Sequence, residues 1–139
     1  MTIESNNVAE TERAAAELAS RLRGGECVAL RGDLGAGKTQ FVRGLAAALG
    51  VNPRQVCSPT FVLLHIYEGG RLRLYHLDAY RVAGADDFDA IGFAELLDDP
   101  TGVVVVEWAE RVEPALPARR IDVSFQATGP TSRRIHIVE

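Results

Sequence analysis

The most restrictive feature of this sequence is the segment GDLGAGKT at residues 32–39. It fits the phosphate-binding loop pattern G-x-x-x-x-G-K-[ST] at every specified position. An apolar run at residues 26–31 precedes it and is typical of a buried strand, and apolar side chains recur at helical intervals over residues 38–49. Because strand, glycine loop and helix follow one another directly, the segment predicts an α/β fold with a phosphate site where the helix begins.

The residue types in this loop suit a bound polyphosphate. Glycines allow backbone amides to approach phosphate oxygens, and the helix that follows adds the positive end of its dipole. Lys38 is expected to reach the β and γ phosphates, and the Thr39 hydroxyl is expected to ligate Mg²⁺. The predicted nucleotide contacts in this segment are Asp33, Leu34, Gly35, Ala36, Gly37, Lys38, Thr39 and Gln40.

Hydrophobic periodicity predicts one α/β domain over residues 1–139. With 47% hydrophobic residues, the chain is long enough for one core and too short for two comfortable domains. We expect a three-layer P-loop domain, with parallel central strands around the loop and antiparallel strands at the margins. The other predicted elements are a helix at 9–23 capped by Asn7 and stopped by Gly24 and Gly25, a hairpin of strands 60–67 and 71–78, short helical turns within 86–97, a buried strand at 103–106, and an antiparallel pair at 121–126 and 133–139.

Two acidic residues stand at the ends of predicted strands. Asp78 ends the second strand of the hairpin, and Glu107 follows the valine run at residues 103–106. A nucleotide hydrolase needs a carboxylate that holds the metal and a group that positions the attacking water. Periodicity leaves open which of Asp78 and Glu107 takes which role, and a solvated strand end is the alternative for each.

Charge restricts the partners of the chain. Its 15 Lys and Arg against 19 Asp and Glu give a formal net charge of −4, which disfavours a surface coated in positive charge for binding a polyanion. Any direct contact with nucleic acid is therefore expected to be local. Arg119–Arg120 and Arg133–Arg134 form one basic patch if the two tail strands pair, or else face solvent separately.

The chain shows no sign of export or membrane insertion. It opens without a basic segment followed by an apolar run, and its longest aliphatic stretch, residues 103–106, is far too short to span a bilayer. We therefore expect a cytoplasmic protein. In that reducing compartment Cys27 and Cys57 are expected to be buried thiols rather than a disulfide.

Four segments together resemble the TsaE family, namely GDLGAGKT at 32–39, SPTF at 58–61, YHLDAYR at 75–81 and VEWAER at 106–111. Members of this family are bacterial ATPases that assist synthesis of threonylcarbamoyladenosine on tRNA. The resemblance therefore implies hydrolysis of ATP to ADP and phosphate, Mg²⁺ as cofactor, and TsaB and TsaD as partners. It also implies that contact with tRNA is indirect or made through a local patch.

The resemblance implies roles for individual residues as well. Residues 58–60 match the first switch-like segment of the family, Asp78 its second, and Glu107 with Trp108 its acidic-aromatic pair. Thr60 and Trp108 thereby join the expected nucleotide contacts, although a packing role is an equal alternative for Trp108. The expected catalytic residues are Lys38, Asp78 and Glu107, and the expected metal ligands are Thr39, Asp78 and Glu107.

Two other functions are consistent with a phosphate loop. One is a small P-loop kinase, for which an Arg-rich lid is hard to find, and the other is a nucleotide-gated binding module with incidental turnover. The chain has no N-K-x-D segment, whose absence favours adenine over guanine. Arg81 either steadies a phosphate or forms a surface ion pair. His65, His76 and His136 lack metal-ligand spacing and are interpreted as structural.

Overall fold

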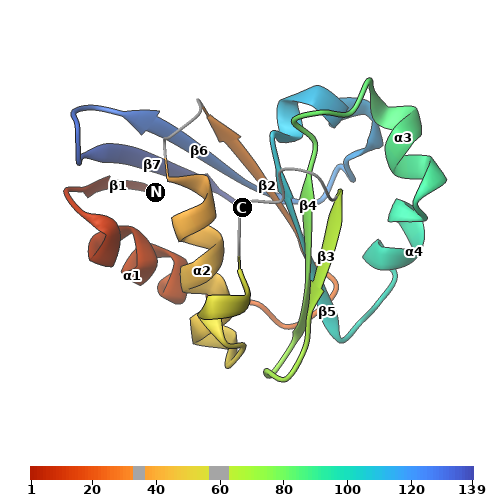
Figure 1. Cartoon of the computed structure of the whole chain (residues 1–139), viewed down its shortest axis with the longest axis horizontal. Coiled ribbons are helices and arrows are strands. Elements are labelled where there is room, and N and C mark those ends of the chain that lie inside the picture. The colour runs from red at the N-terminus through yellow and green to blue at the C-terminus, as the bar shows by residue number, and fades with distance from the viewer. Residues whose placement is uncertain (33–36, 57–62) are drawn as a thin grey trace.

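The computed structural model describes residues 1–32, 37–56 and 63–139, and a seven-stranded sheet forms the centre of this described part (Figure 1). The strands follow the order β1-β7-β6-β2-β5-β4-β3 across the sheet. Their bounds are β1 Thr2–Ser5, β2 Cys27–Gly32, β3 Leu64–Tyr67, β4 Arg73–Asp78, β5 Gly102–Glu107, β6 Ile121–Ala127 and β7 Arg133–Val138. The strand that leads into the glycine loop, β2, is therefore the middle strand.

The central strands run parallel and the marginal strands antiparallel, as predicted. β2 pairs in parallel with both β5 and β6, and β5 pairs in parallel with β4. At the margins β3 runs antiparallel to β4, β7 antiparallel to β6, and β1 antiparallel to β7. Because β2, β4 and β5 point the same way, their carboxyl ends meet at one edge of the sheet.

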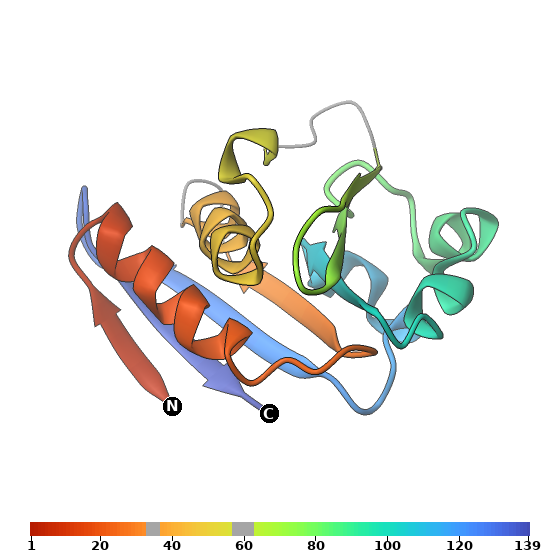
Figure 2. The ribbon, with the colours of Figure 1, turned by 90° about the horizontal axis from the view of Figure 1, so that it is seen from below.

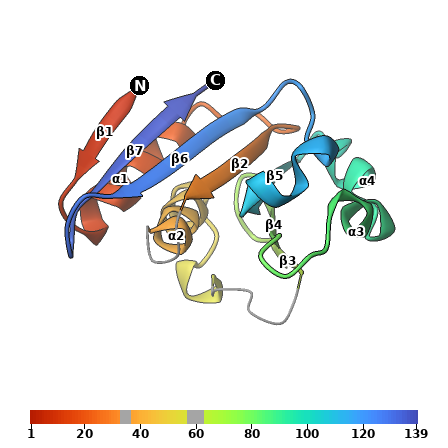
Figure 3. The same cartoon turned by 90° about the horizontal axis from the view of Figure 1, so that it is seen from above.

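Helices cover both faces of the sheet and give the three layers expected. α1 (Val8–Ala19) and α2 (Lys38–Leu49) pack on one face, and α3 (Ala85–Ala90), α4 (Phe93–Leu97) and the 3-10 segment η2 (Ala109–Ala115) pack on the other (Figure 1, Figure 3). A short 3-10 turn, η1 (Pro53–Gln55), follows α2. Among the described residues, no helix combines the length and the apolar character needed to cross a bilayer.

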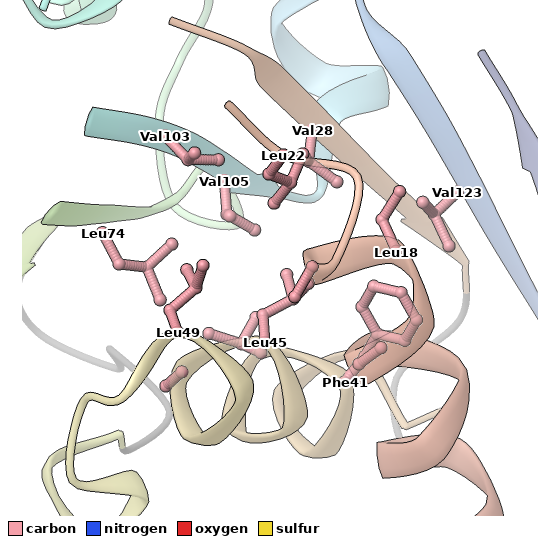
Figure 4. Close-up of a cluster of buried hydrophobic side chains, with 14 of the residues drawn as sticks. Leu18, Leu22, Val28, Phe41, Leu45, Leu49, Leu74, Val103, Val105 and Val123 are labelled. Atoms are coloured by element: carbon pink, nitrogen blue, oxygen red, sulfur yellow. The ribbon is translucent and has the colours of Figure 1, made fainter. Parts of the chain in front are cut away.

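Alternating side chains along the strands build a core on each face. In β2, Val28 and Leu30 belong to the core under α1 and α2, whereas Cys27 and Ala29 belong to the core under α3, α4 and η2. Figure 4 shows the first core, where Leu45 and Leu49 of α2 point toward valines of β2 and β5, and Phe41 lies toward Val123 of β6. This core holds α2, whose first turn carries the predicted phosphate site, against the sheet.

α1 begins where predicted and ends earlier. The Asn7 side chain accepts a hydrogen bond from the Glu10 amide at 2.9 Å and caps the first turn. The helix ends at Ala19, before the expected end at residue 23, and the Arg71 guanidinium donates to the carbonyls of Ala19 and Leu22 at 2.8 and 2.9 Å. Arg71 comes from the distant hairpin, a contact that periodicity within the helix does not report.

Periodicity predicts neither β1 nor η2. β1 is a four-residue edge strand, and its order comes from pairing with β7 at the other end of the chain. The terminal amine donates to the Ile137 carbonyl at 2.9 Å, and Figure 2 shows the two termini side by side. Ser5 and Thr11 share a buried hydrogen bond of 2.7 Å that ties β1 to α1. Long-range pairing of this kind leaves little trace in a short segment.

The tail strands pair, but their arginines do not gather into one basic patch. The register sets Asp122 opposite Val138 and Ala127 opposite Arg133, so the two arginine pairs lie at opposite ends of the β6–β7 ribbon. Arg120 bonds to Asp122 at 3.0 Å, and Arg134 bonds to Glu4 at 2.6 Å. Of the two alternatives, the register excludes the single basic patch. The Cys27 thiol is buried as expected, which raises its pKa to about 12, while Cys57 lies outside the described residues.

Close packing of α1 on α2 depends on Gly44. A Cβ at this position would lie 2.8 Å from the Ala15 Cβ and 2.8 Å from the Glu12 Cα. Gly44→Ala should push the helices apart and lower the free energy of unfolding by about 1–3 kcal/mol, despite the better helix propensity of alanine. Urea unfolding measures the change. Gly84→Ala is the control, since a Cβ there meets nothing within 4 Å, and equal midpoints for both variants would contradict the packing.

Candidate nucleotide site

The carboxyl ends of neighbouring parallel strands converge on the amino end of α2. Asp78 ends β4 and Glu107 ends β5, and these two residues lie opposite each other in the register. Glu107 also lies beside Leu30 of β2, the strand that leads into the loop. Gly37, with a φ of 99°, directly precedes the first residue of α2. This edge of the sheet is where open α/β folds place their ligands.

Lys38, the only lysine in the sequence, is buried at this convergence. Its ammonium donates a hydrogen bond to the Gly32 carbonyl and lies 3.7 Å from the centroid of the Trp108 ring. A cation over the face of an indole is attracted by the quadrupole of the ring. The expected phosphate-binding lysine and the expected aromatic contact are therefore direct neighbours.

Trp108 turns the chain sharply where β5 ends. Its φ of 58° is the only positive φ of a non-glycine residue in the described part of the chain, and such a conformation costs about 1–3 kcal/mol. The centroid of its ring lies 5.0 Å from that of Tyr80, and the Arg111 guanidinium lies 5.9 Å from the Trp108 ring. These contacts hold the indole between Lys38 and the exposed Tyr80 ring.

The two carboxylates differ in environment. Glu107 is 3% exposed, and its Oε1 accepts a long hydrogen bond of 3.5 Å from the Thr39 hydroxyl. Asp78 is only partly buried, and its Oδ1 accepts from the Tyr80 amide at 2.9 Å. Burial raises the pKa of Asp78 and the Glu107 charge raises it further, while the Tyr80 amide and the Lys38 charge act in the opposite direction. The α2 hydroxyl thus contacts Glu107, and Asp78 is the carboxyl that is harder to ionise than usual.

Arg133, from β7, packs against the start of α2. A Cβ built on Gly37 would lie 1.9 Å from the Arg133 Nη1, so a side chain at position 37 would displace this guanidinium. The Nε and Nη1 atoms of Arg133 are buried and have no hydrogen-bond partner among the described residues. Buried donors without a partner are costly, and an anion is the partner that a guanidinium binds best. The sequence does not predict this position, because nothing in a tail segment indicates which loop an arginine reaches.

The remaining expected site residues are placed as follows. Asp33, Leu34, Gly35, Ala36 and Thr60 lie outside the described residues, as do Ser58 and Pro59. Gln40 is partly buried in the first turn of α2, and Arg81 is exposed. His76, interpreted from sequence as structural only, has its Nε2 2.5 Å from Oε2 of Glu107. Its spacing of two residues from Asp78 places both on one face of β4, which is the signal that the sequence offered.

Comparison with known proteins assigns the chain to a family. The sequence profile described as "Threonylcarbamoyl adenosine biosynthesis protein TsaE" matches residues 5–135. The chain belongs to the TsaE family. It is 42% identical over 133 residues to the tRNA threonylcarbamoyladenosine biosynthesis protein TsaE of Treponema pallidum, covering 96% of each chain. It is 40% identical over 129 residues to the Bacillus subtilis protein of that name, covering 93% of this chain and 79% of the relative.

A solved structure shares the fold. The crystal structure of Bacillus subtilis YdiB superimposes with a TM-score of 0.76 at 33% identity, covering 97% of this chain and 82% of YdiB. Three of the segments that resemble the TsaE family, 32–39, 75–81 and 106–111, contribute described residues to the edge of the sheet where α2 begins. The segment 58–61 lies outside the described residues. The family resemblance thus concentrates on the structural site.

The raised pKa of Asp78 predicts a gain in stability when its charge is removed. Because the folded-state pKa lies above the ordinary 3.8, this group's contribution to stability falls as the pH rises from 3.8 through the folded-state value. Asp78→Asn should therefore raise the Tm at pH 7 by about 2–4 °C. Calorimetry measures it, with Asp86→Asn as an exposed control. A lower Tm for Asp78→Asn would show that its charge stabilises the fold.

Proposed function

We propose that this protein is an ATPase that hydrolyses ATP to ADP and phosphate in the biosynthesis of threonylcarbamoyladenosine on tRNA. The observation that carries the proposal is the meeting of Lys38 and Thr39, in the first turn of α2, with Glu107 at the end of β5. Membership of the TsaE family supports the pathway, because the family and its relatives in Treponema pallidum and Bacillus subtilis are named for it.

The amino end of α2 suits the phosphates of ATP. Its first N–H groups carry partial positive charge, and the Lys38 ammonium lies beside them. The buried Nε and Nη1 of Arg133 are donors without a partner among the described residues, next to Gly37. A bound phosphate would satisfy such donors with charge-assisted hydrogen bonds. For Lys38, binding replaces the neutral Gly32 carbonyl by an anionic acceptor.

Thr39 and Glu107 suit a magnesium ion. Mg²⁺ takes oxygen ligands at about 2.1 Å in an octahedron, so neighbouring ligands lie about 3.0 Å apart. The Thr39 hydroxyl and the Glu107 Oε1 lie 3.5 Å apart. When bound, Mg²⁺ would neutralise charge that develops on the β and γ phosphate oxygens. We assign Thr39 and Glu107 to the metal on this separation.

Asp78 is then the carboxylate that orients the attacking water. It lies opposite Glu107 in the register and is less buried, so solvent reaches it more readily. Its raised pKa makes it a stronger hydrogen-bond acceptor and base than an ordinary aspartate once it is ionised. Lys38 and Arg133 would stabilise charge on the transferred phosphoryl group. Each catalytic task thus has a residue from a different element.

The partners are proposed on resemblance. TsaB and TsaD are the proteins with which the ATPase is proposed to work, with tRNA contacted indirectly or through a local patch. Adenine is proposed over guanine because the sequence lacks the N-K-x-D segment. The cytoplasm is the proposed compartment, since ATP and tRNA are both available there.

The central test is ATP hydrolysis by the purified protein, alone and with TsaB and TsaD from the same organism. We expect equal amounts of ADP and free phosphate, formed only with Mg²⁺ and faster with the partners. A phosphorylated metabolite in place of free phosphate would favour a small kinase. Full tRNA modification by a Glu107→Ala variant that binds ATP without turnover would favour a nucleotide-gated binding module.

Variants of the first turn of α2 separate phosphate binding from metal use. Lys38→Ala should weaken ATP binding about 100-fold, because a hydrogen bond to a charged group contributes up to ~3 kcal/mol. Thr39→Ala should reduce Mg²⁺-dependent turnover and leave binding in EDTA unchanged. Calorimetric titration measures the ATP affinity with Mg²⁺ and in EDTA, and phosphate release measures turnover. Arg54→Ala, which removes an exposed cation on η1, is the control. Undiminished ATP affinity in Lys38→Ala would refute the phosphate assignment.

Trp108, the only tryptophan, reports on the same exchange. If Lys38 moves from the indole face to a phosphate, the cation that now lies 3.7 Å from the ring centroid is displaced. The emission of Trp108 should therefore change in wavelength or intensity when ATP is added. Lys38→Ala is the matched control. Without ATP, the Trp108 emission of this variant should already differ from that of the wild-type protein, and it should change little when ATP is added. Identical spectra with and without ATP would place the nucleotide away from Trp108.

A further inference from the structure

A buried polar line extends behind Glu107. His76, from β4, is fully buried, and its Nε2 lies 2.5 Å from the Glu107 Oε2. On the other side of the ring, Nδ1 lies 3.2 Å from the hydroxyl of Tyr67, which is itself buried on β3. The line from Glu107 through His76 to Tyr67 therefore crosses three neighbouring strands, β5, β4 and β3.

The two oxygens of Glu107 have unequal partners. Oε2 lies 2.5 Å from His76 Nε2, whereas Oε1 lies 3.5 Å from the Thr39 hydroxyl. A carboxylate this deeply buried needs hydrogen-bond donors, and the shorter contact restrains it more firmly. Oε2 is thus the anchored oxygen, and Oε1 is the oxygen presented to α2.

We propose that His76 is a positioning residue for Glu107 and that Tyr67 fixes the ring tautomer this requires. When the Tyr67 hydroxyl donates to Nδ1, the remaining ring N–H is on Nε2 and donates to Oε2 of Glu107. Glu107 then keeps one orientation, with Oε1 directed to Thr39. Groups behind a metal ligand commonly orient it in this way. The inference rests on the proposed function, in which Glu107 and Thr39 hold the metal.

A purely structural histidine has different consequences. Such a residue would satisfy the buried carboxylate, and its loss would lower stability without a specific effect on the metal. Loss of a positioning residue instead weakens metal binding and turnover, while nucleotide affinity without metal stays the same. The dependence on metal concentration therefore separates the two roles.

The test compares three variants with a matched control. His76→Leu removes both ring nitrogens, His76→Gln retains an N–H donor, and Tyr67→Phe removes only the hydroxyl. We expect the Mg²⁺ concentration for half-maximal hydrolysis to rise about 10-fold in His76→Leu and less in the other two, with metal-free ADP affinity unchanged. His136→Gln is the control, because this histidine is exposed on β7, away from β3, β4 and β5, and the variant should keep wild-type values.

Binding of Mn²⁺ to the ADP complex, followed by electron paramagnetic resonance, gives a readout that needs no turnover. His76→Leu should weaken Mn²⁺ binding when Glu107 is present. In a Glu107→Gln background, the same substitution should weaken Mn²⁺ binding by less than about two-fold, because His76 acts through Glu107. The inference would be overturned if His76→Leu and Tyr67→Phe kept the metal dependence of the wild-type protein. It would also be overturned if His76→Leu weakened Mn²⁺ binding equally in the Glu107→Gln background.

Three further outcomes are informative. If His76→Leu does not fold, His76→Gln and Tyr67→Phe decide on the same terms, and unchanged metal dependence in both rejects the positioning role. If the wild-type protein does not hydrolyse ATP but its Mn²⁺ binding is weakened by His76→Leu, the proposed ATPase is refuted and the inference about His76 is kept. Absence of both nucleotide and metal binding in the wild-type protein would refute the two together.

Discussion

The parallel register of β2, β5 and β4 is the constraint on which the site depends. It sets Asp78 opposite Glu107 and Glu107 beside Leu30, so that two strand ends reach the edge at which α2 begins. The core between α2 and the sheet then fixes the distance from Thr39 to Glu107. Shifting one strand by a single residue would reverse the faces of its side chains and remove a carboxylate from the site. The placement of Thr39, Asp78 and Glu107 therefore depends on the valines and leucines of the core.

Sequence patterns predict the local parts of this arrangement well. α2 spans residues 38–49 as its apolar spacing indicates, and the three-layer sheet has the expected parallel centre. What the patterns do not predict comes from contacts between distant segments. Arg133 reaches Gly37 from β7, Arg71 bonds the end of α1, and β1 is ordered by pairing with the opposite end of the chain. Such contacts depend on strand order, which periodicity does not encode.

The burial of Glu107 explains why polar residues occur inside an otherwise apolar sheet. Taking a carboxylate to 3% exposure is unfavourable unless donors surround it. The Thr39 hydroxyl of α2 is one such donor, and His76 of β4 is the second in the tautomer proposed above. With an apolar residue in place of His76, the long hydrogen bond from Thr39 would be the one left to the carboxylate among the described residues. The polar line through the sheet is thus a consequence of placing an acid where the metal is proposed to bind.

Charge at the site is divided by sign, and strand order causes the division. Arg133 and the amino end of α2 lie on the side of β2 and β7, whereas Asp78 and Glu107 end β4 and β5, and the Lys38 ammonium lies against Trp108, which follows Glu107. The whole chain has a net charge of −4, so the positive charge near the start of α2 is confined to that part of the surface. A nucleotide with its metal has the same division, with anionic phosphates and a cation. Phosphates without the metal would face two carboxylates, and repulsion would oppose their binding. The proposed requirement for Mg²⁺ is therefore supported by the order of the strands as well as by the loop sequence.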